Sequence, residues 1–123
     1  MAITNVISNS SKMFKELIVI NKTNMNLKNV HLLYEGFERP VLKISDLPKG
    51  QQLKKSLLTN FLKKPTKLLL IYNLNTDEQK SILAYDSICS DDLSTLTLSI
   101  ENSDDNLIVN YISENNSGYV DQK

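Results

Sequence analysis

Histidine and cysteine, the side chains that most often carry enzymatic chemistry, each occur once in this chain of 123 residues. With His31 as the only histidine, a single chain holds neither a histidine-based triad nor a multi-histidine metal site. Cys89 has no partner for an internal disulfide. A nucleophilic thiolate needs a base or a positive neighbour, whereas Cys89 is followed by Asp91 and Asp92. We therefore expect a surface histidine, an inert thiol and a protein that is not an enzyme.

Two aspartate pairs, Asp91-Asp92 and Asp104-Asp105, have the ligand type that calcium prefers. A strand over residues 94–101 would hold the two pairs roughly 27 Å apart, at opposite ends of the fold. We therefore expect solvated loop acids and no metal site. The three glycines form no phosphate-binding loop, and nothing in the sequence requires a cofactor. Catalysis by carboxylates alone stays open, because sequence does not reveal their spatial pairing.

The charges are unevenly distributed although the net charge is zero. Residues 43–67 carry seven lysines against Asp46, and residues 77–121 carry ten acids against Lys80. With one arginine and no interleaved aromatic residues, the lysine-rich segment is not expected to bind nucleic acid. Two interpretations remain: the segments lie side by side and neutralise each other, or a charged face recognises a protein.

The composition is that of a globular protein, with 41% hydrophobic and 23% charged residues. The chain has no apolar run of the roughly 18 residues that span a membrane. No basic segment followed by an apolar stretch marks a signal peptide at the N-terminus. Together with the single cysteine, these features predict a cytoplasmic protein that does not contact membranes.

Seven segments have the period-two alternation or β-branched composition of strands. They predict an all-β domain over residues 13–112, preceded by a polar arm or edge strand over 1–12 and followed by a flexible tail over 113–123. The apolar run at 66–73 is typical of a central strand covered on both faces. The predicted strands are 14–20, 30–35, 41–45, 66–73, 79–88, 94–101 and 106–112.

The connections are predicted from turn residues. Pro48 and Gly50 fit a type I turn that begins at Leu47, and residues 102–105 fit a four-residue hairpin loop. Residues 51–64 are ambiguous. Their apolar residues recur at helical spacing before Pro65, yet the same stretch fits a strand at 51–58 followed by a loop.

Three runs, VINKTNMNLKNVHLLYEG, ISDLPKGQQL and KLLLIYN, resemble bacterial immunoglobulin-like or fibronectin-III-like β-sandwich domains. The resemblance covers residues 16–73 and rests on Asn21, Leu27, Val30 and the Leu-Pro-x-Gly turn at 47–50. The chain departs from true immunoglobulin domains because it lacks tryptophan and a second cysteine. The resemblance implies an immunoglobulin-like β-sandwich of about seven strands, an architecture that hosts many functions.

These observations predict a small cytoplasmic protein-binding module, such as an inhibitor, immunity or anti-defence protein. Thirteen lysines against one arginine indicate an AT-rich coding sequence, as in a low-GC bacterium or its phage. The alternative is an exported accessory domain that binds a surface protein or a carbohydrate. We expect the C-terminal hairpin to meet a partner with a basic surface, which its acids would steer. The oligomeric state is not specified, and the predicted partner-binding residues are Glu101, Asp104, Asp105 and Glu114.

Overall fold

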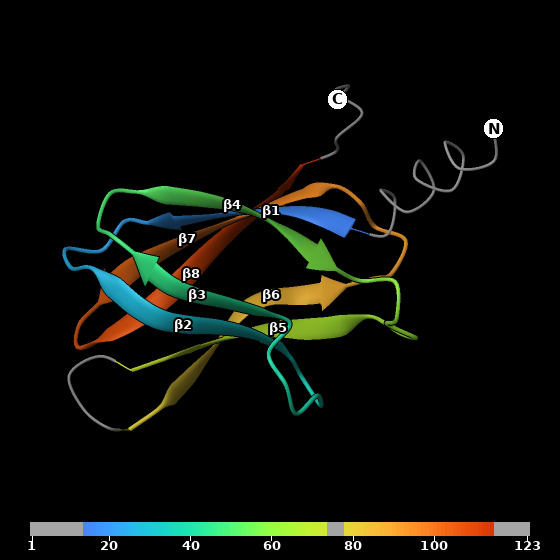
Figure 1. The fold of residues 1–123 in the computed structure, drawn as a ribbon, viewed down its shortest axis with the longest axis horizontal. Helices are drawn as coiled ribbons and strands as arrows, with labels where there is room; N and C mark the ends of the chain where they lie inside the picture. Colours follow the sequence, from blue (N-terminus) through green and yellow to red (C-terminus); the bar gives the residue numbers. More distant parts are fainter. Residues whose placement is uncertain (1–13, 74–77, 115–123) are drawn as a thin grey trace.

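A computed structural model of the chain describes residues 14–73 and 78–114, which form eight strands in two sheets (Figure 1). The all-β class is confirmed, with eight described strands where about seven were predicted. No helix long and apolar enough to cross a membrane is found among these residues. The strands are β1 (Phe14–Asn21), β2 (Leu27–Tyr34), β3 (Leu42–Leu47), β4 (Gln52–Leu58), β5 (Thr66–Tyr72), β6 (Lys80–Ile88), β7 (Thr95–Ser103) and β8 (Asn106–Glu114).

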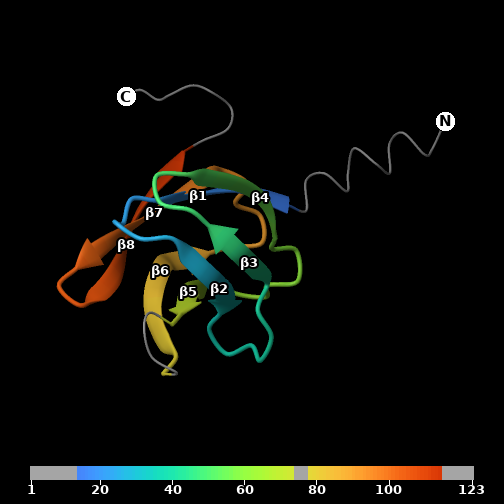
Figure 2. The same ribbon diagram turned by 60° about the vertical axis from the view of Figure 1, so that its left-hand side comes forward.

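The two four-stranded sheets stack as a sandwich (Figures 1 and 2). One sheet has the order β4-β1-β7-β8, and the other has the order β3-β2-β5-β6. All neighbours are antiparallel except β1 and β7, which run in parallel. One side of the sandwich is closed by β6 and β8, where the rings of Tyr85 and Tyr111 meet edge to face at 4.8 Å.

The core lies between the sheets and follows the alternation of the strands. On β7, Leu96, Leu98 and Ile100 point inward and are fully buried, as the sequence pattern predicts. On β5, Leu70 is buried between the sheets, whereas Leu69 faces outward and is only partly covered. The prediction that this strand is covered on both faces is therefore wrong for the described chain.

The ambiguous segment at residues 51–64 forms a strand and then a loop, so the alternative of a helix is wrong. Leu53 and Leu57 are four residues apart, a spacing that places side chains on one face of a helix and equally on one face of a strand. Pairing with β1 decides between them, because β4 follows β1 in register from Phe14 opposite Leu58 to Ile20 opposite Gln52.

The structure places both predicted turns at slightly different residues. The turn after β3 runs from Pro48 to Gln51, not from Leu47, and the amide of Gln51 donates to the carbonyl of Pro48 at 3.1 Å. Gly50 thereby takes the third position with a φ of 79°, a conformation that favours glycine. The β7–β8 loop is a two-residue turn at Asp104 and Asp105, since Ser103 still pairs with Asn106.

Apart from Val30, the residues that carry the resemblance meet at one end of the sandwich. The buried amide of Asn21 donates to the carbonyls of Met25 and Leu47, both at 2.9 Å. The amide of Gly50 donates to the carbonyl of Asn21 at 2.8 Å, and Leu27 pairs with Leu47.

The last predicted strand is longer in the structure, where β8 continues two residues beyond its predicted end. The predicted arm at 1–12 and residues 115–123 of the predicted tail lie outside the described residues.

Candidate functional site

Two loops at the end of the sandwich opposite Asn21 border a concave surface. The first, residues 35–41, connects β2 to β3, and the second, residues 59–65, connects β4 to β5. Gly36 is the second residue of the first loop and has a φ of 90°, and Pro65 ends the second loop immediately before β5. The two loops border a pocket of about 870 Å³.

Three aromatic side chains build the floor and wall of this pocket. The ring of Tyr34, the last residue of β2, lies 5.9 Å from that of Phe37 and 5.8 Å from that of Phe61. Phe37 and Phe61 approach each other to 5.6 Å, which closes the triangle. Tyr34 is buried, but 44% of Phe37 and 40% of Phe61 remain exposed. Two large apolar side chains on different loops are thus presented to solvent side by side.

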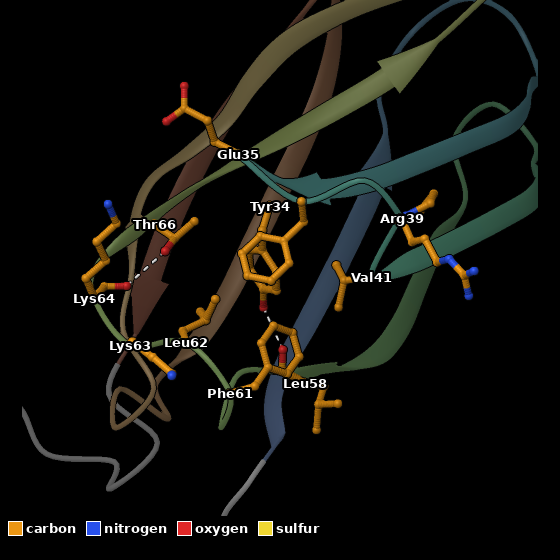
Figure 3. Close-up of a pocket in the computed structure, with 12 residues that line it drawn as sticks. Tyr34, Glu35, Arg39, Val41, Leu58, Phe61, Leu62, Lys63, Lys64 and Thr66 are labelled. Carbon is orange, nitrogen blue, oxygen red and sulfur yellow. Dashed lines mark hydrogen bonds between the residues drawn. The ribbon is translucent and has the colours of Figure 1, made fainter.

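Hydrogen bonds and burial fix the strand ends from which the two loops start. The hydroxyl of Tyr34 donates to the carbonyl of Leu58 at 2.8 Å, which joins the end of β2 to the end of β4 (Figure 3). Burial raises the pKa of this phenol well above its usual value, so the hydroxyl stays protonated and keeps its role as donor. The amide of Glu35 donates to the carbonyl of Lys67 at 2.9 Å, and the side chain of Leu62 is buried in the core. The pocket is therefore largely preformed.

Charged side chains surround the aromatic cluster. In the view of Figure 3, Arg39 lies on one side of the rings, and Lys63 and Lys64 lie on the other. Glu35 also lines the pocket, but its carboxylate points away from the aromatic side chains (Figure 3). The pocket thus combines an apolar interior with three cations at its border and one carboxylate that points away from the rings.

The predicted acidic residues do not form one surface. Asp104 and Asp105 are exposed in the β7–β8 turn, and Glu101 lies close by on β7, where its carboxylate accepts a hydrogen bond from Asn110 at 2.9 Å. Glu114 ends β8 opposite Thr95, six residues beyond the partner of Glu101, which is roughly 20 Å along the strand. The structure brings three of the four residues together, at the end of the sandwich opposite the pocket.

The ion pairs that the structure shows do not join the lysine-rich and acid-rich segments. Lys54 pairs with Glu16 of β1 at 3.4 Å, and Lys28 lies 4.0 Å from Asp46. Each of these pairs joins neighbouring strands within one sheet. They do not supply the mutual neutralisation that was one interpretation of the charge pattern.

Lys15 is the one lysine that is fully buried among the described residues. Its ammonium group donates to the carbonyl of Ser94 at 2.6 Å and lies 3.4 Å from the carboxylate of Asp92. Burial lowers the pKa of Lys15, and the charge of Asp92 opposes that shift. Because no face of Lys15 reaches solvent, we assign it a structural role: it fastens the β6–β7 loop to β1.

The single histidine and the single cysteine lie outside the residues that line the pocket. His31 is partly exposed on the outer face of β2, and Cys89 is partly exposed after β6. No three histidine, cysteine, aspartate or glutamate side chains within residues 14–73 and 78–114 are grouped as metal ligands would be.

No protein-family model matches the chain, and no characterised protein or solved structure matches it.

Sequence reasoning did not identify the residues of the pocket. Tyr34 lies within the strand predicted at 30–35 and is buried, but no binding role was predicted for Phe37, Arg39 or Phe61. A usable signal was present, because both phenylalanines occur in polar loop segments, FER and FLKK, where a large apolar residue has no local reason to be. Their proximity, 24 positions apart in sequence, follows only from the folded chain.

Proposed function

We propose that this chain is a protein-binding module and that its partner binds at the aromatic pocket between residues 35–41 and 59–65. The observation that carries the proposal is the pair of exposed phenylalanines held against the buried Tyr34. Exposed aromatic side chains and arginine are the residue types that dominate the binding energy of protein interfaces. The preformed loops favour binding because little conformational freedom is lost on association.

The exposed area sets the scale of the expected effect. About two fifths of each phenylalanine is exposed, so covering both side chains removes roughly 170 Å² of apolar surface from water. At about 25 cal/mol per Å², the upper limit of this contribution to the complex is about 4 kcal/mol, because the costs of ordering and desolvation on association offset part of it. Such a contribution corresponds to about three orders of magnitude in Kd.

Several predictions made from the sequence accompany this proposal. A non-enzymatic cytoplasmic inhibitor, immunity or anti-defence protein of a low-GC bacterium or phage fits a small interaction module. We also propose an immunoglobulin-like sandwich, supported by the contacts among Asn21, Leu47 and Gly50. The alternative, an exported accessory domain that binds a surface protein or a carbohydrate, is less well supported, since the exposed surface of the pocket is mainly apolar.

A comparative pull-down from a lysate of the source organism tests the proposal. The double variant Phe37→Ala/Phe61→Ala should lose proteins that the wild-type chain retains, with binding weakened by about 100-fold or more. The matched control is Ile108→Ala/Ile112→Ala, which removes two similarly exposed apolar side chains from β8. Circular dichroism and the melting temperature confirm that both variants are folded.

The opposite pattern would overturn the assignment. If the β8 variant loses the retained proteins and the phenylalanine variant keeps them, the pocket is not the partner-binding site. If reversal of Asp104 and Asp105 to lysine abolishes retention while the phenylalanine variant binds normally, the acidic hairpin is the interface.

A further inference from the structure

The charges around the pocket restrict what can bind between its loops. Arg39, Lys63 and Lys64 line it, and the carboxylate of Glu35 points away from the rings (Figure 3). A basic partner segment would place its positive charges next to these three cations, which repel them, whereas the carboxylates of an acidic segment would be attracted. Arginine pairs with carboxylates through two parallel hydrogen bonds, and lysine supplies a flexible point charge. The border of the pocket thus favours an anionic occupant.

The interior of the pocket requires an apolar group next to those anions. Phe37 and Phe61 are tilted by 54° to each other, and each stands edge-on to Tyr34. Such an arrangement leaves ring edges and faces at different angles, which accommodates one further aromatic side chain in edge-to-face contact. A volume of about 870 Å³ lies within the range of sites that enclose a small ligand or a few side chains.

We infer that the pocket takes an acidic peptide segment with a large apolar side chain, best an aromatic one, between its carboxylates. This inference rests on the proposed function and specifies the partner. It reverses the polarity expected from sequence, in which acids of this chain meet a basic partner. The apolar side chain enters between Phe37 and Phe61, and the flanking carboxylates meet Arg39 on one side and Lys63 and Lys64 on the other.

Single-stranded nucleic acid is also anionic and aromatic, but the geometry favours it less. Proteins that bind it combine a basic track several nucleotides long with aromatic faces on which successive bases stack. Here the three rings are turned against each other at 54° to 78°, so they present no parallel ladder of faces. The three cations that line the pocket also lie at one place and do not form a track several nucleotides long.

Fluorescence anisotropy with short labelled peptides tests the inference. The probe has a central phenylalanine flanked by two aspartates on each side in a Gly-Ser background. One comparison peptide has asparagine in place of aspartate, and another has alanine in place of phenylalanine. We expect the probe to bind at least about 10-fold more tightly than either, with an affinity that falls as salt rises because the charges are screened.

Two pairs of sequence-adjacent lysines supply the test variant and its matched control. Lys63→Gln/Lys64→Gln should remove most of the preference for the acidic peptide. Lys54→Gln/Lys55→Gln removes the same charge from β4, outside the residues that line the pocket, and should leave the preference unchanged. Equal losses in the two variants would show non-specific attraction and refute the site. Equal affinity for the acidic and neutral peptides would refute the charge requirement.

Two further outcomes separate this inference from the proposed function. Tighter binding of a labelled oligothymidylate than of the probe, or no binding of any peptide, overturns the inferred ligand. If the phenylalanine variant still loses its partners in the pull-down, the binding site itself stands. If that variant retains them, the pocket is not the site, and the inference and the proposed function fail together.

Discussion

Alanine substitutions at Leu70 and Leu69 test which face of β5 meets the core. Leu70 is fully buried between the sheets, with β2 and β6 on either side of its strand. Truncating a buried leucine removes its transfer free energy and leaves a cavity, which together cost about 3–4 kcal/mol. Leu69 is adjacent in sequence but lies partly exposed on the outer face. Water can fill the space it leaves, so the cost should be about 1 kcal/mol.

Urea denaturation followed by far-ultraviolet circular dichroism measures both free energies of unfolding. A domain of this size has about 5–12 kcal/mol of stability, so Leu70→Ala should remain folded, with a melting temperature lower by about 12–25 °C. Leu70→Asp should unfold the domain, because it buries an unpaired charge. The slope of unfolding free energy against urea should not change. If Leu69→Ala costs as much as Leu70→Ala, the outer face of β5 is covered after all and the assignment of faces is refuted.

Two further predictions concern a turn and an ion pair. Asp104 has a φ of 56°, a conformation that glycine tolerates and β-branched residues do not. Asp104→Gly should therefore keep or raise the melting temperature, and Asp104→Val should lower it. Equal melting temperatures of the two variants would contradict a strained turn. Burial disfavours the ionised form of Asp92, but hydrogen bonds from Ser94 and the charge of Lys15 outweigh it and lower the pKa of Asp92 below 3.8. The stabilisation from this carboxylate is therefore complete above the unfolded pKa and is lost as pH falls through the folded pKa. In stability measurements between about pH 5 and pH 2, Asp92→Asn should lose less stability than the wild type, and parallel curves would refute this assignment.

The sequence alone determined the class of the fold and the direction of many side chains. Alternation predicted a strand over 94–101, and the three apolar residues that share one face of it, Leu96, Leu98 and Ile100, are all fully buried. Glycine and proline also marked the connections, although the turn after β3 lies one residue later than predicted. These features are readable because the period of a strand and the backbone preferences of glycine and proline are local properties.

The tertiary structure decided the features that depend on residues distant in sequence. Pairing with β1 made residues 52–58 a strand, since Leu53 and Leu57 fit one face of either element. The apolar run of β5 predicted burial on both faces, but an apolar pattern does not specify how many layers will cover it. The pocket forms where the ends of β2 and β4 meet across the sandwich, joined by Tyr34 and Leu58, and this brings Phe37 and Phe61 together. Such long-range contacts depend on packing throughout the domain, so no local pattern encodes them.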